Sequence, residues 1–193
     1  MDDIVKQAIA KWPNVPACVG WLGLDARGNW YMRDDGAQAA GPFVSGSPDP
    51  VRRAAARGSR LLHDRLVDFI ARNYEGDAAG QWFFQNGPQR VFVELEITPL
   101  IWRIADGPGF AVTAHTGAPA QVLACLLDEQ GRVYLHTSAG FGLVHSLDMA
   151  LAADAIEQGV WVPEAVLAHD LPTRFGYVCS PQQHPHRAPT PVV

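Results

Sequence analysis

Apolar residues recur at helical spacing in two segments of the first half of the chain. Near the N-terminus, Asp2 or Asp3 can cap a helix that Pro13 ends. Its apolar positions are Ile4, Val5, Ala8, Ile9 and Trp12. Ser59 can cap a second helix, whose apolar stripe is formed by Leu62, Leu66, Phe69, Ile70 and Tyr74. The pattern therefore predicts two amphipathic helices.

Two β-hairpins are predicted where turn residues interrupt strand-like segments. The first turns over residues 25–28, and the second turns at Asn86 and Gly87. In the return arm of the second hairpin, one face carries Val91, Val93, Leu95 and Ile97, and the other carries Phe92, Glu94, Glu96 and Thr98. This alternation predicts a half-buried antiparallel strand. Residues 34–59 are rich in Gly, Ala, Ser and Pro without an apolar period, which predicts a mobile loop.

The second half of the chain has the pattern of a three-stranded meander followed by a helix. The predicted strands cover residues 110–116, 121–127 and 132–138. The segment HTSAGFGLVH, from His136 to His145, is predicted to be a strand-to-helix corner. A helix over 146–158 follows, with Gly159 as its stop and one apolar row formed by Leu147, Leu151 and Ala155.

Strands in hairpins with segregated helices indicate an α+β fold of antiparallel sheets. We predict two small β-rich lobes, residues 1–106 and 107–180, and a disordered Pro-rich tail, residues 181–193. The frame L-D-x-x-G-x-x-Y occurs at 24–31 and again at 127–134. It indicates either two similar turns or the duplication of a hairpin-plus-helix unit.

Composition narrows the class of protein. The net charge of −5 and pI of about 5.7 argue against a nucleic-acid partner, since the local basic cluster is limited to Arg52, Arg53, Arg57 and Arg60. No apolar run approaches the roughly 18 residues of a membrane span, and the acidic N-terminus lacks the features of a signal peptide. Three widely spaced cysteines fit a reducing compartment. We expect a cytoplasmic protein that binds neither nucleic acid nor membrane.

The histidine-flanked corner offers two kinds of chemistry. Its two glycines precede a predicted helix, but the third glycine of GxGxxG and the Lys-Ser/Thr of a P-loop are absent, which favours a tight turn over a phosphate site. As metal ligands, the candidates are His136, His145 and Asp148. His115 lies about 9–10 Å from His136 if the meander is regular, which is too far for a shared metal. We expect no metal and no cofactor, and name these three residues as the ligands if a metal is bound.

Glu94 and Glu96 form a second candidate pair. At positions i and i+2 of one strand face, their side chains lie about 6.5–7 Å apart, a spacing suited to acid–base chemistry. Arg90 and Arg103 are close enough in sequence to neutralise them, which would make this a salt-bridged strand face.

Aromatic residues cluster at the ends of the predicted hairpin arms. Trp30, Trp82 and Trp102, together with His115, His136 and His145, are the candidate ligand-binding residues, and the loop over 36–58 would be a lid. Packing in the core is the alternative explanation for these tryptophans.

Several segments resemble bacterial families of unknown function. In one family, a D-G-x-W hairpin is followed by a Leu-rich helix, an L-V-x-P-V-E-K strand and a D-x-P-F turn. Over residues 20–110, DARGNWYMRD, LLHDRLVDFIARNY, EITPLIW and ADGPGF are similar to these parts, although Leu100 and Ile101 replace the Glu and Lys. The whole chain, with KWPNVPACVGWLGLDARGNWYMRDD and GFGLVHSLDM, resembles a narrower uncharacterised family of short bacterial cytoplasmic proteins. The resemblance implies no activity.

With many aromatics and no assembled catalytic motif, the chain is expected to be a non-catalytic module that binds a small molecule or a protein partner. The alternative is a small metal-assisted or hydrolase-like enzyme that uses His136, His145 and Asp148, together with Glu94 or Glu96. A homo-oligomer formed through an exposed strand edge is compatible with the first hypothesis.

Overall fold

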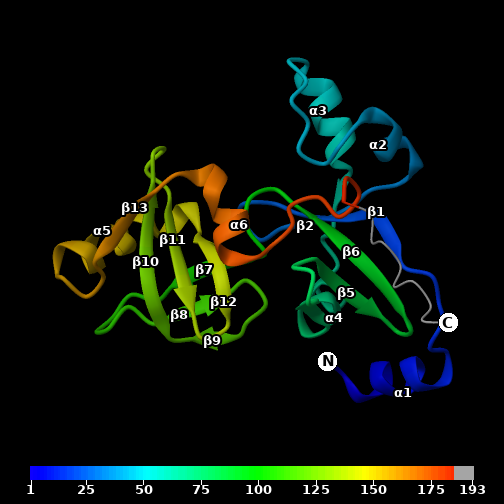
Figure 1. The fold of residues 1–193 in the computed structure, drawn as a ribbon, viewed down its shortest axis with the longest axis horizontal. Helices are drawn as coiled ribbons and strands as arrows, with labels where there is room; N and C mark the ends of the chain where they lie inside the picture. Colours follow the sequence, from blue (N-terminus) through cyan, green and yellow to red (C-terminus); the bar gives the residue numbers. More distant parts are fainter. Residues whose placement is uncertain (185–193) are drawn as a thin grey trace, which may run out of the picture.

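The structure, a computed structural model that describes residues 1–184, has a mixed α+β architecture (Figure 1). The N-terminal sheet has the strand order β3-β2-β1-β6-β5-β4. It contains β1 (Cys18–Leu24), β2 (Trp30–Met32), β3 (Ser59–Arg60), β4 (Tyr74–Gly76), β5 (Trp82–Asn86) and β6 (Gln89–Leu95). The C-terminal sheet has the order β13-β10-β11-β12-β7-β8-β9. It contains β7 (Leu100–Ile104), β8 (Val112–Ala114), β9 (Pro119–Ala120), β10 (Val122–Asp128), β11 (Val133–Thr137), β12 (Gly140–Val144) and β13 (Pro163–Val166).

Both sheets are mixed rather than purely antiparallel, which corrects the sequence prediction. The strand pairs β1–β6, β10–β13 and β12–β7 are parallel. The α-helices in the described residues are α1 (Asp3–Lys11), α2 (Asp35–Ala40), α3 (Pro50–Arg57), α4 (Asp64–Arg72), α5 (Met149–Glu157) and α6 (Leu171–Phe175). Short 3-10 helices, η1 (Ser146–Asp148) and η2 (Ala168–Asp170), precede α5 and α6. None of the helices within residues 1–184 is both long and apolar enough to cross a bilayer.

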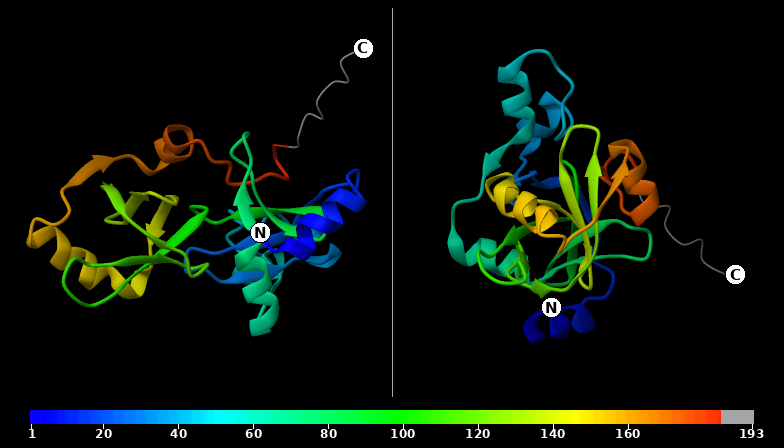
Figure 2. Two further views of the ribbon diagram at one scale, coloured as in Figure 1. Left: turned by 90° about the horizontal axis from the view of Figure 1, so that it is seen from below. Right: turned by 90° about the vertical axis from the view of Figure 1, so that its left-hand side faces the viewer.

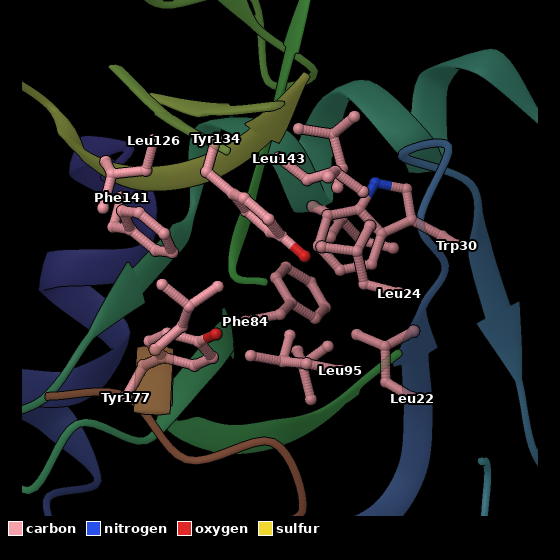
Figure 3. Close-up of a cluster of buried hydrophobic side chains, with 14 residues drawn as sticks. Leu22, Leu24, Trp30, Phe84, Leu95, Leu126, Tyr134, Phe141, Leu143 and Tyr177 are labelled. Carbon is pink, nitrogen blue, oxygen red and sulfur yellow. The ribbon is translucent and has the colours of Figure 1, made fainter. Parts of the chain in front are cut away.

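One apolar core joins the two sheets (Figure 3). The N-terminal sheet contributes Leu22, Leu24, Trp30, Phe84, Val93 and Leu95, and the C-terminal sheet contributes Leu126, Tyr134, Phe141 and Leu143. Burial of each large apolar side chain stabilises the fold by about 1.5–3 kcal/mol. The chain passes from one sheet to the other between β6 and β7, so the predicted boundary at residue 106 falls inside the C-terminal sheet, after β7. A second core lies between the C-terminal sheet and α5, and includes Trp102, Ala152 and Ala155.

The repeated sequence frame forms the same hydrogen-bonded turn twice. Asp25 Oδ1 accepts from the backbone N–H groups two and four residues further on, and the Tyr31 hydroxyl donates to its Oδ2 at 3.2 Å. Asp128 repeats each of these contacts, with the Tyr134 hydroxyl at 2.9 Å. Asp77 caps a third turn with the same backbone pattern, although the leucine and tyrosine of the frame are missing there. Asp-x-x-Gly turn chemistry is thus sufficient to explain the turn geometry.

The segment predicted to be a mobile loop, residues 34–59, contains two short helices. Asp34 accepts a hydrogen bond from the N–H of Ala37 and begins α2, and Asp49 accepts one from Val51 and begins α3. Pro50 occupies the first turn of α3, where its missing N–H costs nothing. The prediction was wrong because the two Asp caps, rather than apolar periodicity, define these helices.

Helix α4 begins later than predicted. Ser59 lies in β3, and the imidazole of His63 caps the helix instead by accepting from the N–H of Leu66. Leu62, predicted to be in the apolar stripe, precedes the helix and is 75% exposed. Similarly, Leu147 of the predicted row on α5 is 68% exposed, while Ala152 and Ala155 are buried.

The meander in the structure is made of other strands than predicted. Strand β8 pairs with β7 and β9, so the true antiparallel meander is β10-β11-β12. Its third strand is formed by GFGLV, residues that were predicted to be a strand-to-helix corner. The helical turn starts only at His145, which caps η1. The sequence could not reveal this, because a five-residue apolar run with two glycines fits a strand and a turn equally well.

Gly142 is required by the close approach of β12 to β7. A Cβ atom at this position would collide with the carbonyl oxygen of Leu100 and lie 2.6 Å from Nε1 of Trp102. We expect Gly142→Ala to lower the free energy of unfolding by about 1–3 kcal/mol, since backbone atoms would have to move. Urea unfolding measures this cost, and Gly46→Ala, which has open space around it, is the matched control. An equal effect of the two substitutions would contradict the prediction.

The strand predicted to carry Glu94 and Glu96 ends at Leu95 and is more buried than predicted. Strand β6 runs antiparallel to β5 and parallel to β1, and Phe92 and Glu94 on its predicted polar face are both buried. Part of the predicted tail is ordered as well: the N–H of Gln182 donates to Glu94 at 2.9 Å. Residues 185–193 of that tail lie outside the described residues.

Candidate functional site

Three of the predicted ligand-binding residues lie together in the core. The His115 ring centroid is 5.5 Å from Trp30 and 5.9 Å from Tyr74, and Tyr74 in turn contacts Trp82 at 4.9 Å. His115 Nδ1 accepts from the N–H of Ile101, and its Nε2 is buried without a partner among the described residues. Burial lowers the pKa of His115 to about 4, so the ring is neutral at pH 7. This cluster is packed rather than hollow, and it holds the two sheets together.

The other predicted residues lie elsewhere. The His136 ring packs on Phe175 with centroids 5.3 Å apart, while His145 Nδ1 accepts from the N–H of Leu147. Trp102 is fully buried, and its indole donates to the carbonyl of Leu135 at 3.1 Å. These contacts identify the residues as parts of the packing and capping of the C-terminal sheet.

The candidate metal ligands do not converge. His136 is opposite Phe141 in the β11–β12 ladder, so His145, four residues further along, lies about 13 Å away. The carboxylate of Asp148 is engaged by Arg103, at 2.6 and 3.1 Å, and by the N–H of Ile104. Within residues 1–184, no group of three or more His, Cys, Asp or Glu side chains is placed to hold a metal ion.

A groove with polar chemistry lies on the face of the N-terminal sheet that is turned away from the shared core. Two adjoining hollows meet at Phe43, Val44 and Glu96. The Arg57 hollow, of about 380 Å³, is lined by residues that include Phe43, Ser45, Arg53, Ala54, Arg57 and Glu96. The Ser180 hollow, of about 180 Å³, is lined by residues that include Phe43, Glu94, Glu96, Cys179, Ser180 and Gln183.

Three parts of the chain build this groove. Strand β6 leads into its floor, the segment with α2 and α3 forms one wall, and residues 179–183 form the other. Figure 1 shows α2 and α3 projecting from the N-terminal sheet, and the right-hand view of Figure 2 shows the same projection from another side. The predicted lid over residues 36–58 is therefore a helical wall of the groove.

Gly23 and Arg33 fasten the helical wall to the sheet. Phe43 lies flat over Gly23, where a Cβ atom would be 2.5–2.8 Å from three atoms of its ring. The guanidinium of Arg33 is fully buried and donates to the carbonyls of Ala56, Gly20 and Gly41 at 2.9, 3.0 and 2.6 Å. One side chain therefore ties β1 to the ends of both helices.

An ion pair between Arg57 and Glu96 occupies the centre of the groove. Arg57 Nη2 donates to Glu96 Oε2, which also accepts from the N–H of Ala26. The guanidinium carbon lies 5.2 Å from the Tyr31 ring centroid and 5.3 Å from that of Phe43, both within range of cation–π attraction. Arg57 Nε is buried and has no hydrogen-bond partner among the described residues. One edge of the guanidinium, formed by Nε and Nη2, is thus only half used: among the described residues, Nη2 has a hydrogen-bond partner and Nε has none.

Glu94 is the other carboxylate of the groove. Its Oε2 accepts from the Ser180 hydroxyl at 2.6 Å, and its Oε1 from the N–H of Gln182 at 2.9 Å. Burial raises the pKa of Glu94, while these two hydrogen bonds and the nearby Arg33 partly oppose the shift. The two glutamates, one in β6 and one just beyond its end, thus have different environments.

The arginines predicted to neutralise the glutamates have other contacts. Arg90 stacks on the Phe83 ring at 4.7 Å, and Arg103 pairs with Asp148. Arg57 and Arg33 take their place. In the sequence, Arg57 stands out only as part of a basic cluster, and Arg33 does not stand out at all. The long-range pairing of a charged residue leaves no local sequence pattern. The aspartate caps of α2 and α3 are the one sequence feature that could have predicted the helical wall of the groove.

These features describe an α+β protein with two mixed sheets, a core that the sheets share and a polar groove on the N-terminal sheet. The chain belongs to a family of proteins of unknown function (DUF2946), whose model matches residues 1–182. This confirms the predicted resemblance to an uncharacterised family. No curated protein matches the chain.

Two solved structures of DUF1285 family proteins are similar to it. The structure from Silicibacter pomeroyi DSS-3 has 12% identity and a TM-score of 0.46, and the match covers 80% of this chain and 84% of that chain. The structure from Shewanella baltica OS155 has 15% identity and a TM-score of 0.45, with 69% and 91% covered.

Proposed function

We propose that the protein is a non-catalytic module that binds a small molecule in the groove between α3, β6 and residues 179–183. The observation that carries this proposal is the half-used edge of the Arg57 guanidinium, in an ion pair at the centre of the groove. Arginine binds carboxylates and phosphates best through two parallel hydrogen bonds from one edge. Glu96 makes only one such bond, because its Oε2 is shared with the N–H of Ala26.

The surroundings of this pair suit a ligand. Specific small-molecule sites combine apolar walls with a few convergent polar groups. Here Phe43 and Val44 supply apolar surface where the two hollows meet, and Ser45, Arg53 and Gln183 supply further polar groups.

Screening the full chain against small acids, amines, amino acids, nucleotides and metal ions tests the proposal, with thermal shift and calorimetry as readouts. We expect at least one compound whose binding is lost in Ala54→Phe, because Ala54 lines the Arg57 hollow and a phenyl ring would fill it. Ala55→Phe, at the neighbouring exposed position of α3 that lines neither hollow, is the matched control. If no compound distinguishes the two variants, the groove is not the binding site.

Metal analysis of the purified protein separates the binding module from the enzyme alternative. Stoichiometric zinc or iron that is lost in His145→Ala would contradict the non-catalytic proposal. Unchanged stability in the presence of a chelator is the result expected of the binding module.

A further inference from the structure

Charge is distributed unevenly along the groove. The Arg57 hollow carries two guanidinium groups, from Arg53 and Arg57, whereas the Ser180 hollow carries the two carboxylates of Glu94 and Glu96. Glu96 lines both hollows, next to Phe43 and Val44. One end of the groove is therefore cationic and the other anionic, and Glu96 lies beside the apolar Phe43 and Val44 where the two ends meet.

A ligand with a single charge would leave one member of the central pair without a partner. An anion that took the edge of Arg57 would compete with Glu96, whose side chain is only 30% exposed. A cation that took Glu96 would leave Arg57, 32% exposed and in contact with the rings of Tyr31 and Phe43, with no counter-ion. Removing one partner from a partly desolvated ion pair is costly, because the remaining charge is not fully hydrated.

We infer that the ligand of this groove is a small zwitterion of the amino-acid type, with its carboxylate on Arg57 and its ammonium group on Glu96. Such a ligand gives Arg57 and Glu96 each a new partner of opposite charge at the same time. Its carboxylate can use Nε and Nη2 together, which satisfies the unpartnered Nε. Its ammonium group donates to Glu96 on the side of the Ser180 hollow, and its apolar part lies against Phe43 and Val44. This inference rests on the proposed binding function and specifies its ligand class.

The direct test compares three ligands that share one apolar skeleton. Leucine carries both charges, 4-methylpentanoate only the carboxylate, and 3-methylbutylamine only the ammonium group. By calorimetry or NMR titration of the full chain, leucine or another amino acid from a complete set is expected to bind. The analogues with one charge are expected to bind about tenfold more weakly or worse. If a carboxylate or amine binds as tightly as its parent amino acid, or if no amino acid binds at millimolar concentration, the inference is wrong.

Two variants that each remove one charge assign the charges to residues. Glu96→Gln is expected to weaken amino-acid binding about tenfold or more and to strengthen carboxylate binding, because it removes the carboxylate that competes for Arg57. Arg57→Gln is expected to weaken both. Arg52→Gln on the same helix and Glu157→Gln on α5 are controls, since both residues are exposed and lie outside the groove. Should Arg57→Gln fail to fold, Glu96→Gln and the three-ligand comparison still decide the question.

The outcomes separate the two proposals. Compounds of one charge that bind the wild type as tightly as any amino acid does, and that are excluded by Ala54→Phe, would overturn the zwitterion inference and support the binding module. Binding that is insensitive to Ala54→Phe would overturn both.

Discussion

Replacing Arg33 with methionine is expected to lower the free energy of unfolding by about 3–5 kcal/mol. The arginine is fully buried and donates to three backbone carbonyls, those of Gly20, Gly41 and Ala56. Methionine fills much of the same space but donates no hydrogen bond, so three carbonyls lose their donor. Glu94 also loses the cation that opposes its burial.

Urea unfolding measures this loss, and limited proteolysis locates it. Because Arg33 joins β1 to the ends of α2 and α3, cleavage within residues 34–58 is expected to appear in Arg33→Met before global unfolding. Arg65→Met, at an exposed position of α4, is the control and is expected to stay within about 0.5 kcal/mol of the wild type. A cost below about 1 kcal/mol for Arg33→Met would show that the three hydrogen bonds are replaced by water or by local rearrangement.

Acidification is expected to destabilise the protein by about 3 kcal/mol through His115 alone. The folded state holds the pKa of this imidazole at about 4 instead of its usual 6.5, because burial disfavours the charged ring more than Asp25 favours it. Between these two values the unfolded chain binds the proton and the folded protein does not. The stabilisation is therefore complete above about pH 6.5 and is lost as the pH falls towards 4.

The variant His115→Asn isolates this contribution. Asparagine can still accept the N–H of Ile101, but it does not titrate and it lacks the ring that packs on Trp30. We expect lower stability than the wild type at pH 7 and a smaller loss between pH 6.5 and pH 4, measured by urea unfolding at each pH. His169→Asn, at a side chain that is 75% exposed, controls for the general effect of removing a histidine. Parallel pH profiles for the wild type and His115→Asn would contradict the role of His115.

The candidate site was only partly predictable. Alternating polarity placed Glu94 and Glu96 on one face of a strand, and in the structure both line the groove, with Glu94 in β6 and Glu96 just beyond its end. The same pattern could not show that β6 is covered on that face, because the covering residues come from the segment around Phe43 and from residues 179–183. Arg57, which completes the central ion pair, is 39 residues away from Glu96 in the sequence.

The histidines and tryptophans show the opposite outcome. His115, Trp30 and Trp82 meet through Tyr74, yet they meet in packed core and not in a cavity. The spacing of residues along the chain indicated which side chains could take part in binding or catalysis. Whether such side chains face a hollow depends on which strands become neighbours in the sheets. The exchange of β8 for β12 in the meander changed those neighbours.

The sequence by itself determined the α+β class, both hairpin turns, the first helix and the Asp-x-x-Gly turn chemistry. Each of these features depends on local interactions between residues within a few positions of one another. Tertiary structure alone decided the parallel pairing of β1 with β6, the shared core and the groove. These depend on contacts between residues far apart in sequence, such as Arg33 with Ala56 and Glu94 with Ser180, which leave no periodic trace in the chain.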